Sequence, residues 1–207
     1  MPTFDLRGIK IANYGLNAQN QITYTGKTNV GDAMDVNLEF RNAEARLYAE
    51  GSLAEYMRKA TGGSISIAVK YIKQAAQKMM YGGSTKKRSI SVKTTGSNGG
   101  TTTPVEVESD VASGKDISNY VGVAFYAPDK IDGVQKFTCV HVVRALFGRP
   151  SMVFKTAGDT LVFQTPTTSG EFLPSTDASQ EMVEVAVVDD EATADAWTDA
   201  VLSEVSS

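Results

Sequence analysis

The chain has little of the chemistry that disulfides, metal sites and membrane spans require. Its 207 residues include one cysteine, Cys139, and one histidine, His141. A single cysteine excludes an intrachain disulfide, and two ligands fall short of the roughly four Cys or His that hold a structural zinc ion. No apolar run approaches the ~20 residues that span a bilayer, and residues 1–15 lack the apolar core and cleavage motif of a signal peptide. We therefore expect no metal, no cofactor and no membrane insertion, in a protein made in the cytoplasm.

The charge balance is mildly acidic. The sequence contains 20 Lys and Arg against 24 Asp and Glu, for a formal net charge of −4. A protein that grips nucleic acid needs clustered Lys and Arg, and the basic run Lys86-Lys87-Arg88 is instead typical of a solvated strand end. The hydrophobic content of 42% is enough for a core, and we predict a single domain over residues 1–207.

Alternation of apolar and polar side chains marks the first third of the chain, as in half-buried strands. One predicted strand has apolar residues on one face and polar residues on the other: Met34, Val36, Leu38 and Phe40 against Asp35, Asn37, Glu39 and Arg41. We expect the apolar face to pack into the core. Further strands are predicted over residues 43–50, 53–60 and 65–69, separated by the turn signals Gly51-Ser52 and Gly62-Gly63.

From residue 71 the apolar spacing changes to that of an amphipathic helix of about three turns. Its apolar stripe consists of Tyr71, Ile72, Ala75, Ala76, Met79 and Met80. A Met-rich stripe at this spacing is typical of core packing. We expect Gly82 or Gly83 to adopt the left-handed conformation that ends the helix.

The second half of the sequence begins with a segment poor in large apolar side chains. Residues 94–119 are rich in Gly, Ser and Thr, which predicts a flexible surface loop with a short strand over 105–108. Strands over 120–127 and 134–143 then flank a Pro and an Asp-Gly pair, which indicate a hairpin with a loop longer than two residues.

The chain is predicted to end in strands and a helix. We expect strands over 160–164 and 182–188, followed by a helix over about 190–205 that Asp189 or Asp190 caps. The apolar side predicted for this helix consists of Ala192, Ala196, Trp197, Ala200 and Val201.

Cys139 and His141 form the one pair that suggests nucleophilic catalysis. Alternate residues of a strand share a face, so a dyad is geometrically possible. The surrounding run of residues 137–143 is apolar, however, and contains no group that would lower the pKa of the thiol. The carboxylate pairs of the sequence are explained by ordinary surface charge. We therefore expect a protein that is not an enzyme.

The order of segments in residues 42–83 is the most informative pattern. An acidic strand around Leu47-Tyr48 leads through Gly62-Gly63 and a further strand into a helix that ends at Gly82-Gly83. This block resembles the centre of the major tail tube proteins of long, non-contractile-tailed bacteriophages, of the Gram-positive type. Other similar segments follow the family's order and cover nearly the whole chain: Gly8–Ala12, Tyr120–Phe137, Arg144–Pro150, Phe163–Pro166 and the acidic helix around Trp197.

The resemblance implies a structural subunit of a virion tail. Members of the family have a β-sandwich or barrel-like core flanked by a short helix, and they form hexameric rings that stack into a tube around a tape measure protein. Tail terminator and initiator proteins complete the tail, and double-stranded DNA passes through the channel without specific binding. We therefore expect a mainly β protein with a short helix and a C-terminal helix, assembled in the host cytoplasm.

Two groups of residues are the candidate functional sites under this resemblance. An acidic channel wall offers no site that would hold DNA phosphates, and the candidate lumen-facing residues are Asp35, Asn37 and Glu39. A flexible loop can become ordered on assembly, and the candidate contact between rings consists of Ser97, Asn98, Gly99 and Gly100.

The sequence departs from the family's commonest pattern in two places. Residues 71–73 replace the usual acidic helix start, and residues 86–119 are longer and richer in Gly and Thr. Two other functions remain open at this point. One is a monomeric β-sandwich that binds carbohydrate or acts at a cell surface, which would need exposed aromatics beside loop carboxylates. The other is a small hydrolase that uses Cys139 and His141.

Overall fold

The computed structural model describes residues 5–49, 52–94, 101–131, 133–151 and 165–203. In chain order the elements are β1 (Arg7–Leu16), β2 (Ile22–Asn29), β3 (Ala33–Ala49), β4 (Ser52–Val69), α1 (Gln74–Tyr81), β5 (Ser84–Thr94), β6 (Thr101–Val111), β7 (Tyr120–Ile131), β8 (Val134–Phe147), β9 (Thr167–Phe172), β10 (Val183–Val188) and α2 (Glu191–Val201). The prediction of a mainly β protein with a short helix and a C-terminal helix is confirmed.

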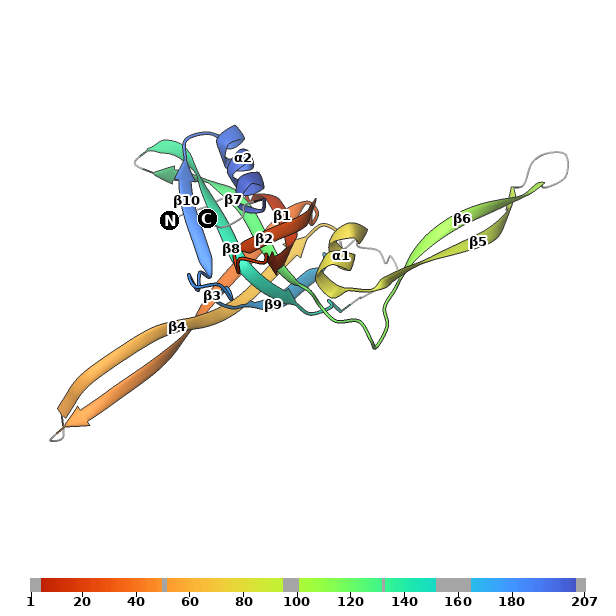
Figure 1. The fold of residues 1–207 in the computed structure, drawn as a ribbon. Helices are drawn as coiled ribbons and strands as arrows, with labels where there is room; N and C mark the ends of the chain where they lie inside the picture. The colour runs from red at the N-terminus through yellow and green to blue at the C-terminus, as the bar shows by residue number, and fades with distance from the viewer. Residues whose placement is uncertain (1–4, 50–51, 95–100, 132, 152–164, 204–207) are drawn as a thin grey trace, which may run out of the picture.

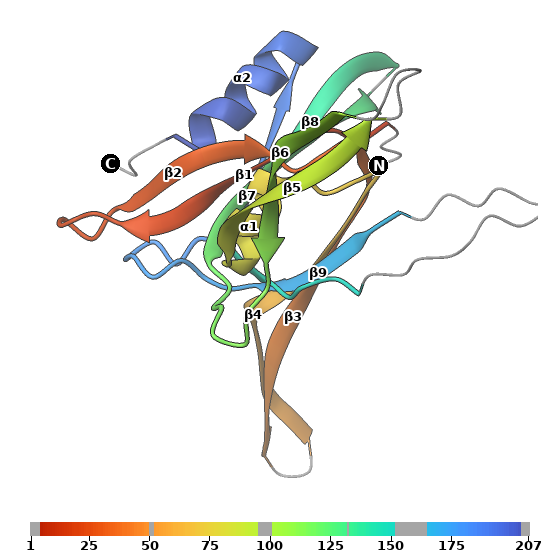
Figure 2. The ribbon, with the colours of Figure 1, turned by 90° about the vertical axis from the view of Figure 1, so that its right-hand side faces the viewer.

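The main sheet is antiparallel and divides at β8. Its strand order is β2-β1-β7-β8-β9-β4-β3, and β10 pairs with β8 as a branch. Residues 137–142 of β8 pair with β10, whereas residues 145–147 pair with β9. The edge of β8 opposite β7 is therefore shared by two strands, and the sheet splits there into two directions (Figures 1 and 2).

The core lies where the sheet folds back on itself. Ile11 of β1 and Ile67 of β4 belong to one buried cluster although their strands lie near opposite ends of the strand order. Val123 of β7 and Phe172 of β9 are fully buried in the same cluster. Helix α1 adds Met80 to it, also fully buried. A sheet whose two ends share one core is the sandwich-like arrangement that the sequence predicts.

Helix α2 covers the other face of β7 and β8. Ala194 packs in a buried cluster with Cys139, and Val201 packs in another with Ala124. Asp190 caps the helix by accepting a hydrogen bond from the backbone N–H of Thr193 at 2.8 Å. Because β7 has the core on one side and α2 on the other, its residues 121–129 are all buried.

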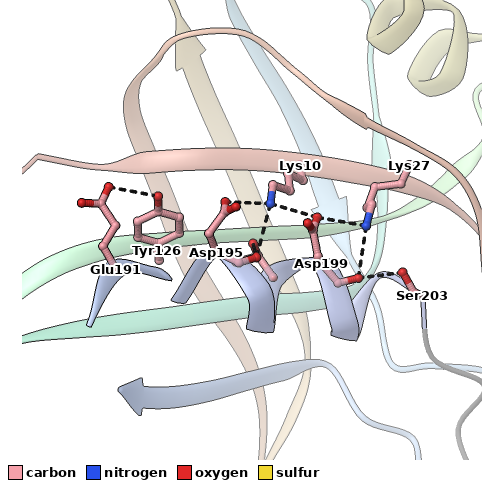
Figure 3. A network of polar contacts seen from close by, with 8 residues as sticks. Lys10, Lys27, Tyr126, Glu191, Asp195, Asp199 and Ser203 are labelled. Carbon is pink, nitrogen blue, oxygen red and sulfur yellow. Dashed lines mark hydrogen bonds and ion pairs between the residues drawn. The ribbon is translucent and has the colours of Figure 1, made fainter. Parts of the chain in front are cut away.

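A network of ion pairs fixes α2 to the sheet (Figure 3). The Lys10 ammonium of β1 lies 2.8 Å from an oxygen of Asp195 and 2.9 Å from an oxygen of Asp199. Lys27 of β2 reaches Asp199 at 2.9 Å. These hydrogen bonds lower the pKa of Asp199 below its ordinary value. Burial works against the charge of Lys10, but its bonds to the two carboxylates outweigh burial and raise its pKa.

Several boundary predictions for the first half are wrong. The strands expected at 34–40 and 43–50 are one strand, β3, and those at 53–60 and 65–69 are one strand, β4. Gly62-Gly63 lies inside β4 because β9 approaches the backbone there: a Cβ on Gly62 would lie 2.6 Å from the carbonyl oxygen of Phe172. Helix α1 begins at Gln74 because the extended Lys73 still donates its backbone N–H to Val30.

The predicted helix faces are only partly correct. In the stripe predicted for the first helix, Ile72, Ala76 and Met80 are buried as expected, whereas Tyr71 and Ala75 are exposed; Tyr71 and Ile72 precede α1. In α2 the buried residues are Ala194, Thr198 and Val201. The predicted residues Ala192, Ala196 and Ala200 are exposed. The ion pairs of Asp195 and Asp199 with Lys10 set the rotation of α2, and small alanine side chains cost little to expose. Positive φ at Gly82 and Gly83 agrees with the predicted helix end.

The second half also differs from prediction at three loops. The segment 94–119, expected to be a flexible loop, contains the strand β6, which includes the predicted short strand over 105–108, is longer than it, and pairs with β5 along its whole length. Strands β7 and β8 stay paired up to Ile131 and Val134, so the hairpin connection is two residues long and not longer. Strand β9 was not predicted, since TTSGEF has little apolar pattern, and the strand expected at 160–164 lies outside the described residues. The strand expected at 182–188 is β10.

Substitution of the α2 network should weaken the fold. We expect Asp199→Asn and Lys10→Met each to lower the free energy of unfolding by about 1–2 kcal/mol, because each removes charge-assisted hydrogen bonds at a partly buried site. The folded pKa of Asp199 is depressed, so its contribution is present above its ordinary pKa of 3.8 and is lost as the pH falls through the folded pKa. Urea denaturation of wild type and Asp199→Asn should therefore differ near neutral pH and converge in acid.

Lys70→Met is the matched control for Lys10→Met. Its ammonium lies 3.9 Å from Asp32 and both side chains are largely exposed, so the same substitution should leave stability unchanged. Equal effects of the two substitutions would show that the network contributes nothing specific.

Candidate assembly surfaces

Two two-stranded arms project from the body of the protein in different directions (Figure 1). The first arm is the part of β3 and β4 over residues 42–60, where β4 has passed its pairing with β9. The second arm is the β5–β6 hairpin, in which each strand pairs only with the other among the described residues. An isolated two-stranded hairpin is at best marginally stable in water.

The first arm has one apolar and one charged face. Residues directly opposite in an antiparallel pair share a face, which puts Ala45 beside Met57 and Leu47 beside Glu55. Leu47 and Met57 are 58% and 62% exposed. On the other face Glu44 forms ion pairs with Arg46 at 3.2 Å and with Arg58 at 3.6 Å. The charged groups therefore satisfy one another, while the apolar face is open.

The polarity of β3 reverses between the body and the first arm. In the body, Val36 and Leu38 pack against the core and the opposite face is polar. Beyond Arg41 the side of the strand that faced the core carries Glu44 and Arg46, and the outer side becomes apolar. The protein's own core lies on the wrong side to cover this apolar face. A second molecule has to cover it if it is to be buried.

The second arm is amphipathic in the same way. One face is predominantly apolar and contains the half-exposed residues Ile90, Val92, Val105 and Val107 together with Arg88 and Lys86 nearer the body. The opposite face pairs Lys87 with Glu108 and Ser89 with Glu106. The basic run 86–88 is exposed, as expected for a solvated strand end.

The predicted lumen-facing residues are exposed along the edge strand β3. Asn37 donates a side-chain hydrogen bond to Glu39 at 3.2 Å. The pairing of β3 shifts between Ala33 and Asp35, and Asp35 consequently lines a groove together with Met34. Whether the three residues face a channel stays a prediction. The prediction that Met34 and Phe40 on the other face of this strand pack in the core is wrong. They are 54% and 51% exposed, because the core ends at this edge of the sheet.

The candidate contact between rings falls between β5 and β6 in the sequence. Ser97, Asn98, Gly99 and Gly100 fall outside the described residues. The described part of the predicted loop is mostly the strand β6, so the feature available for contact is a paired strand with an apolar face. Alternation of Val105 and Val107 with Glu106 and Glu108 is the sequence signal that reveals it.

Cys139 and His141 are packed beneath α2. Burial raises the pKa of the Cys139 thiol to about 11 and lowers the pKa of His141 to about 4. The His141 ring packs edge-on to Tyr24 at 5.6 Å, and its Nδ1 lies 3.6 Å from a carboxylate oxygen of Glu184. Both shifts favour the neutral forms near pH 7, whereas nucleophilic catalysis by such a pair uses a thiolate.

A groove opens between the start of β3 and the strands β7 and β8. Its volume is about 270 Å³. Its lining comprises Asp5, Leu6, Met34, Asp35, Val36, Phe125, Ala127, Thr138 and Val140. This apolar groove was not predicted, because it depends on which sheet edges come together in the fold.

Comparisons with known proteins do not identify a family. No family model and no curated protein matches the chain. Within the described residues, neither helix is long and apolar enough to cross a membrane, and no cluster of three or more His, Cys, Asp or Glu could hold a metal ion.

Burial of His141 predicts an acid sensitivity of the fold. Its folded pKa of about 4 lies below its ordinary value of 6.5, so folding is favoured above pH 6.5 and loses up to about 3 kcal/mol as the pH falls towards 4. His141→Gln should remove this dependence. Urea denaturation between about pH 7 and pH 4.5 measures it. A stability difference between wild type and His141→Gln that stays constant over this range would contradict burial as the cause.

Proposed function

We propose that the protein is the structural subunit of a bacteriophage tail tube. In this proposal it forms hexameric rings that stack around a tape measure protein, between tail initiator and terminator proteins, in a virion tail. The observation that carries the proposal is the pair of arms whose apolar faces a single molecule leaves uncovered. The segment order resembles that of the tail tube family, whose members assemble, and this supports a role of the arms in contacts between subunits.

The geometry favours assembly over a solitary module. Strands β2, β3 and β10 each pair on one side only among the described residues, and unpaired edges are suited to joining sheets of neighbouring copies. Arms that leave the body in different directions reach different neighbours. Contacts that close by rotation generate rings, and those that do not close generate filaments, so a tube needs both.

The carbohydrate-binding alternative has less support. It needs aromatic side chains grouped beside loop carboxylates. Among the described residues the exposed aromatics include Phe40, Tyr48, Tyr56 and Tyr71, of which Tyr48 and Tyr56 lie on strands of the first arm. Arg46 stacks over the Tyr56 ring at 5.5 Å from its centre, so this ring is part of the charged face of the arm. The hydrolase alternative is disfavoured by the neutral, packed state of Cys139 and His141.

The polar face of β3 fits a channel wall in this proposal. Asn37 and Glu39 point away from the subunit core, and the cation of this β3 face, Arg41, forms an ion pair with Glu171 at 2.9 Å. A wall without clustered cations offers DNA phosphates no binding sites, so a duplex can slide along it. Each copy also brings a net charge of −4, which disfavours trapping of DNA.

Self-association of the protein is the first test. We expect purified protein at micromolar concentration, with the tail initiator protein added if needed, to sediment as large species. Leu47→Asp combined with Met57→Asp should reduce assembly strongly while leaving the melting temperature of the single copy nearly unchanged, because both side chains are exposed in it. Glu44→Gln on the opposite face of the arm is the control. Normal assembly of the double variant would show that the apolar face of the first arm is not a contact between subunits.

DNA passage tests the channel. We expect Asn37→Lys with Glu39→Lys to preserve tubes but slow or block DNA ejection, because the new ammonium groups would bind phosphates. Asp35 is left unchanged because it lines the apolar groove. The control, Ser89→Lys with Glu106→Lys, adds the same charge to the polar face of the second arm. Equal slowing by both variants would indicate an effect of overall charge and not of a channel wall.

A further inference from the structure

We infer that the second arm of one copy docks in the apolar groove of a second copy. The apolar face of the arm, carrying Ile90, Val92, Val105 and Val107, enters the groove, and Lys86 and Arg88 meet its acidic rim. This inference rests on the proposed function, because it names the two surfaces that join neighbouring subunits. It uses side chains of β5 and β6 that fall within residues 86–119, where the sequence departs from the tail tube pattern.

The groove continues into an exposed apolar face that ends at an open strand edge. Cross-strand pairing aligns Phe125 of β7, Val140 of β8 and Val185 of β10 in one row on the same face. Exposure rises along the row, from 7% at Phe125 to 60% at Val185. Val187 of β10, one row further, is 47% exposed. Because β10 pairs only with β8 in the described part of the chain, the face is open to a partner at this edge.

The groove is also acidic. The ionisable residues among its lining are Asp5 and Asp35, with no Lys or Arg. Arg7 forms ion pairs with both Asp5 and Glu191. One cation therefore faces two carboxylates, and the Asp5 end of the groove keeps a net negative charge. Asp129, on the same face of β7, is 1% exposed and lies opposite Lys136, so this pair adds no net charge to the surface. An apolar partner that brings cations would complement this surface.

The second arm has the required chemistry and the first arm does not. Its apolar face carries two cations, Lys86 and Arg88, and no acid between Ser84 and Val111. The apolar face of the first arm carries one acid and one base, Glu55 and Lys59, which cancel. Charge complementarity therefore selects the second arm as the occupant of the groove.

The occupant belongs to another copy. The second arm and β10, at the open side of the groove, lie on opposite sides of the body in Figure 1. An arm on one side cannot fill a groove on the other side of the same molecule. A donor and an acceptor on opposite sides generate a head-to-tail contact, which repeats from copy to copy.

A charge exchange tests the contact between the arm and the rim. We expect Arg88→Glu or Asp35→Lys alone to weaken self-association roughly tenfold or more, since each puts like charges together. The double variant with both changes in one chain should recover much of the self-association, because each contact then joins a glutamate at position 88 to a lysine at position 35. Lys87→Glu on the opposite face of the arm is the control and should have no effect. The inference is wrong if Arg88→Glu assembles like wild type or if the double variant is no better than the weaker single one.

Disulfide crosslinking separates this inference from the proposed function. In a Cys139→Ser background, Val105→Cys and Val185→Cys should each stay monomeric on a non-reducing gel after oxidation, and their mixture should give a covalent dimer. Both cysteines in one chain should give a ladder. Ser89→Cys in place of Val105→Cys is the control and should not crosslink.

The outcomes of the crosslinking are distinct. Tubes without the mixed dimer would overturn the docking and leave the tail tube proposal standing. A mixed dimer with a ladder but no rings or tubes would support the docking and contradict the tail tube. Crosslinking of one variant with itself would indicate a symmetric contact and would overturn the head-to-tail arrangement.

Discussion

The three-way pairing of β8 is the constraint on which the rest of the structure depends. Its edge opposite β7 is shared by β10 and β9, so the sheet cannot continue as one flat layer. The β10 branch stays with α2, and the β9 branch leads to β4 and β3. Because β9 has only six residues, the longer β3–β4 pair runs beyond it and leaves the body as an arm. The division of the sheet thus creates the core, the apolar groove and the first arm.

Apolar surface that the core cannot reach connects the fold to the proposed function. Both arms have one polar face and one predominantly apolar face that is open. In β3 the apolar side changes from inner to outer at Arg41, where the pairing with β4 is also irregular. Such a reversal would be a fault in a monomer, because it places apolar side chains in water. In an assembly the reversal would let the inner apolar face of β3 pack on the subunit's own core and the outer apolar face of the arm pack on a neighbouring subunit. In the proposed docking, the acidic groove and the two cations on the apolar face of the second arm give the contact a direction.

The elements predicted well from the sequence are those that local chemistry determines. Asp190 caps α2, Gly82 ends α1, and the apolar run of β10 forms a strand where expected. The errors arise where tertiary contacts decide. The Gly62-Gly63 pair has the sequence of a turn, but it lies within β4 because only glycine leaves room for the approach of β9. Ala192 and Ala196 were predicted on the buried side of α2. They are exposed because Lys10 binds the carboxylate of Asp195 and so turns the helix. Only residues 105–108 of strand β6 are predicted, because the rest of the strand lies in Gly- and Thr-rich surroundings. The groove has no local signal, since its walls come from β7 and β8 in the middle of the strand order and from β3 at its end.

Imaging the purified protein tests the central claim, that the uncovered apolar faces are buried between copies, more directly than any other measurement. Negative-stain electron microscopy of wild-type protein, with and without the tail initiator protein, should show rings with a central channel or tubes made of stacked rings. Dispersed single particles under all of these conditions would contradict the account, because both arms would then remain in water.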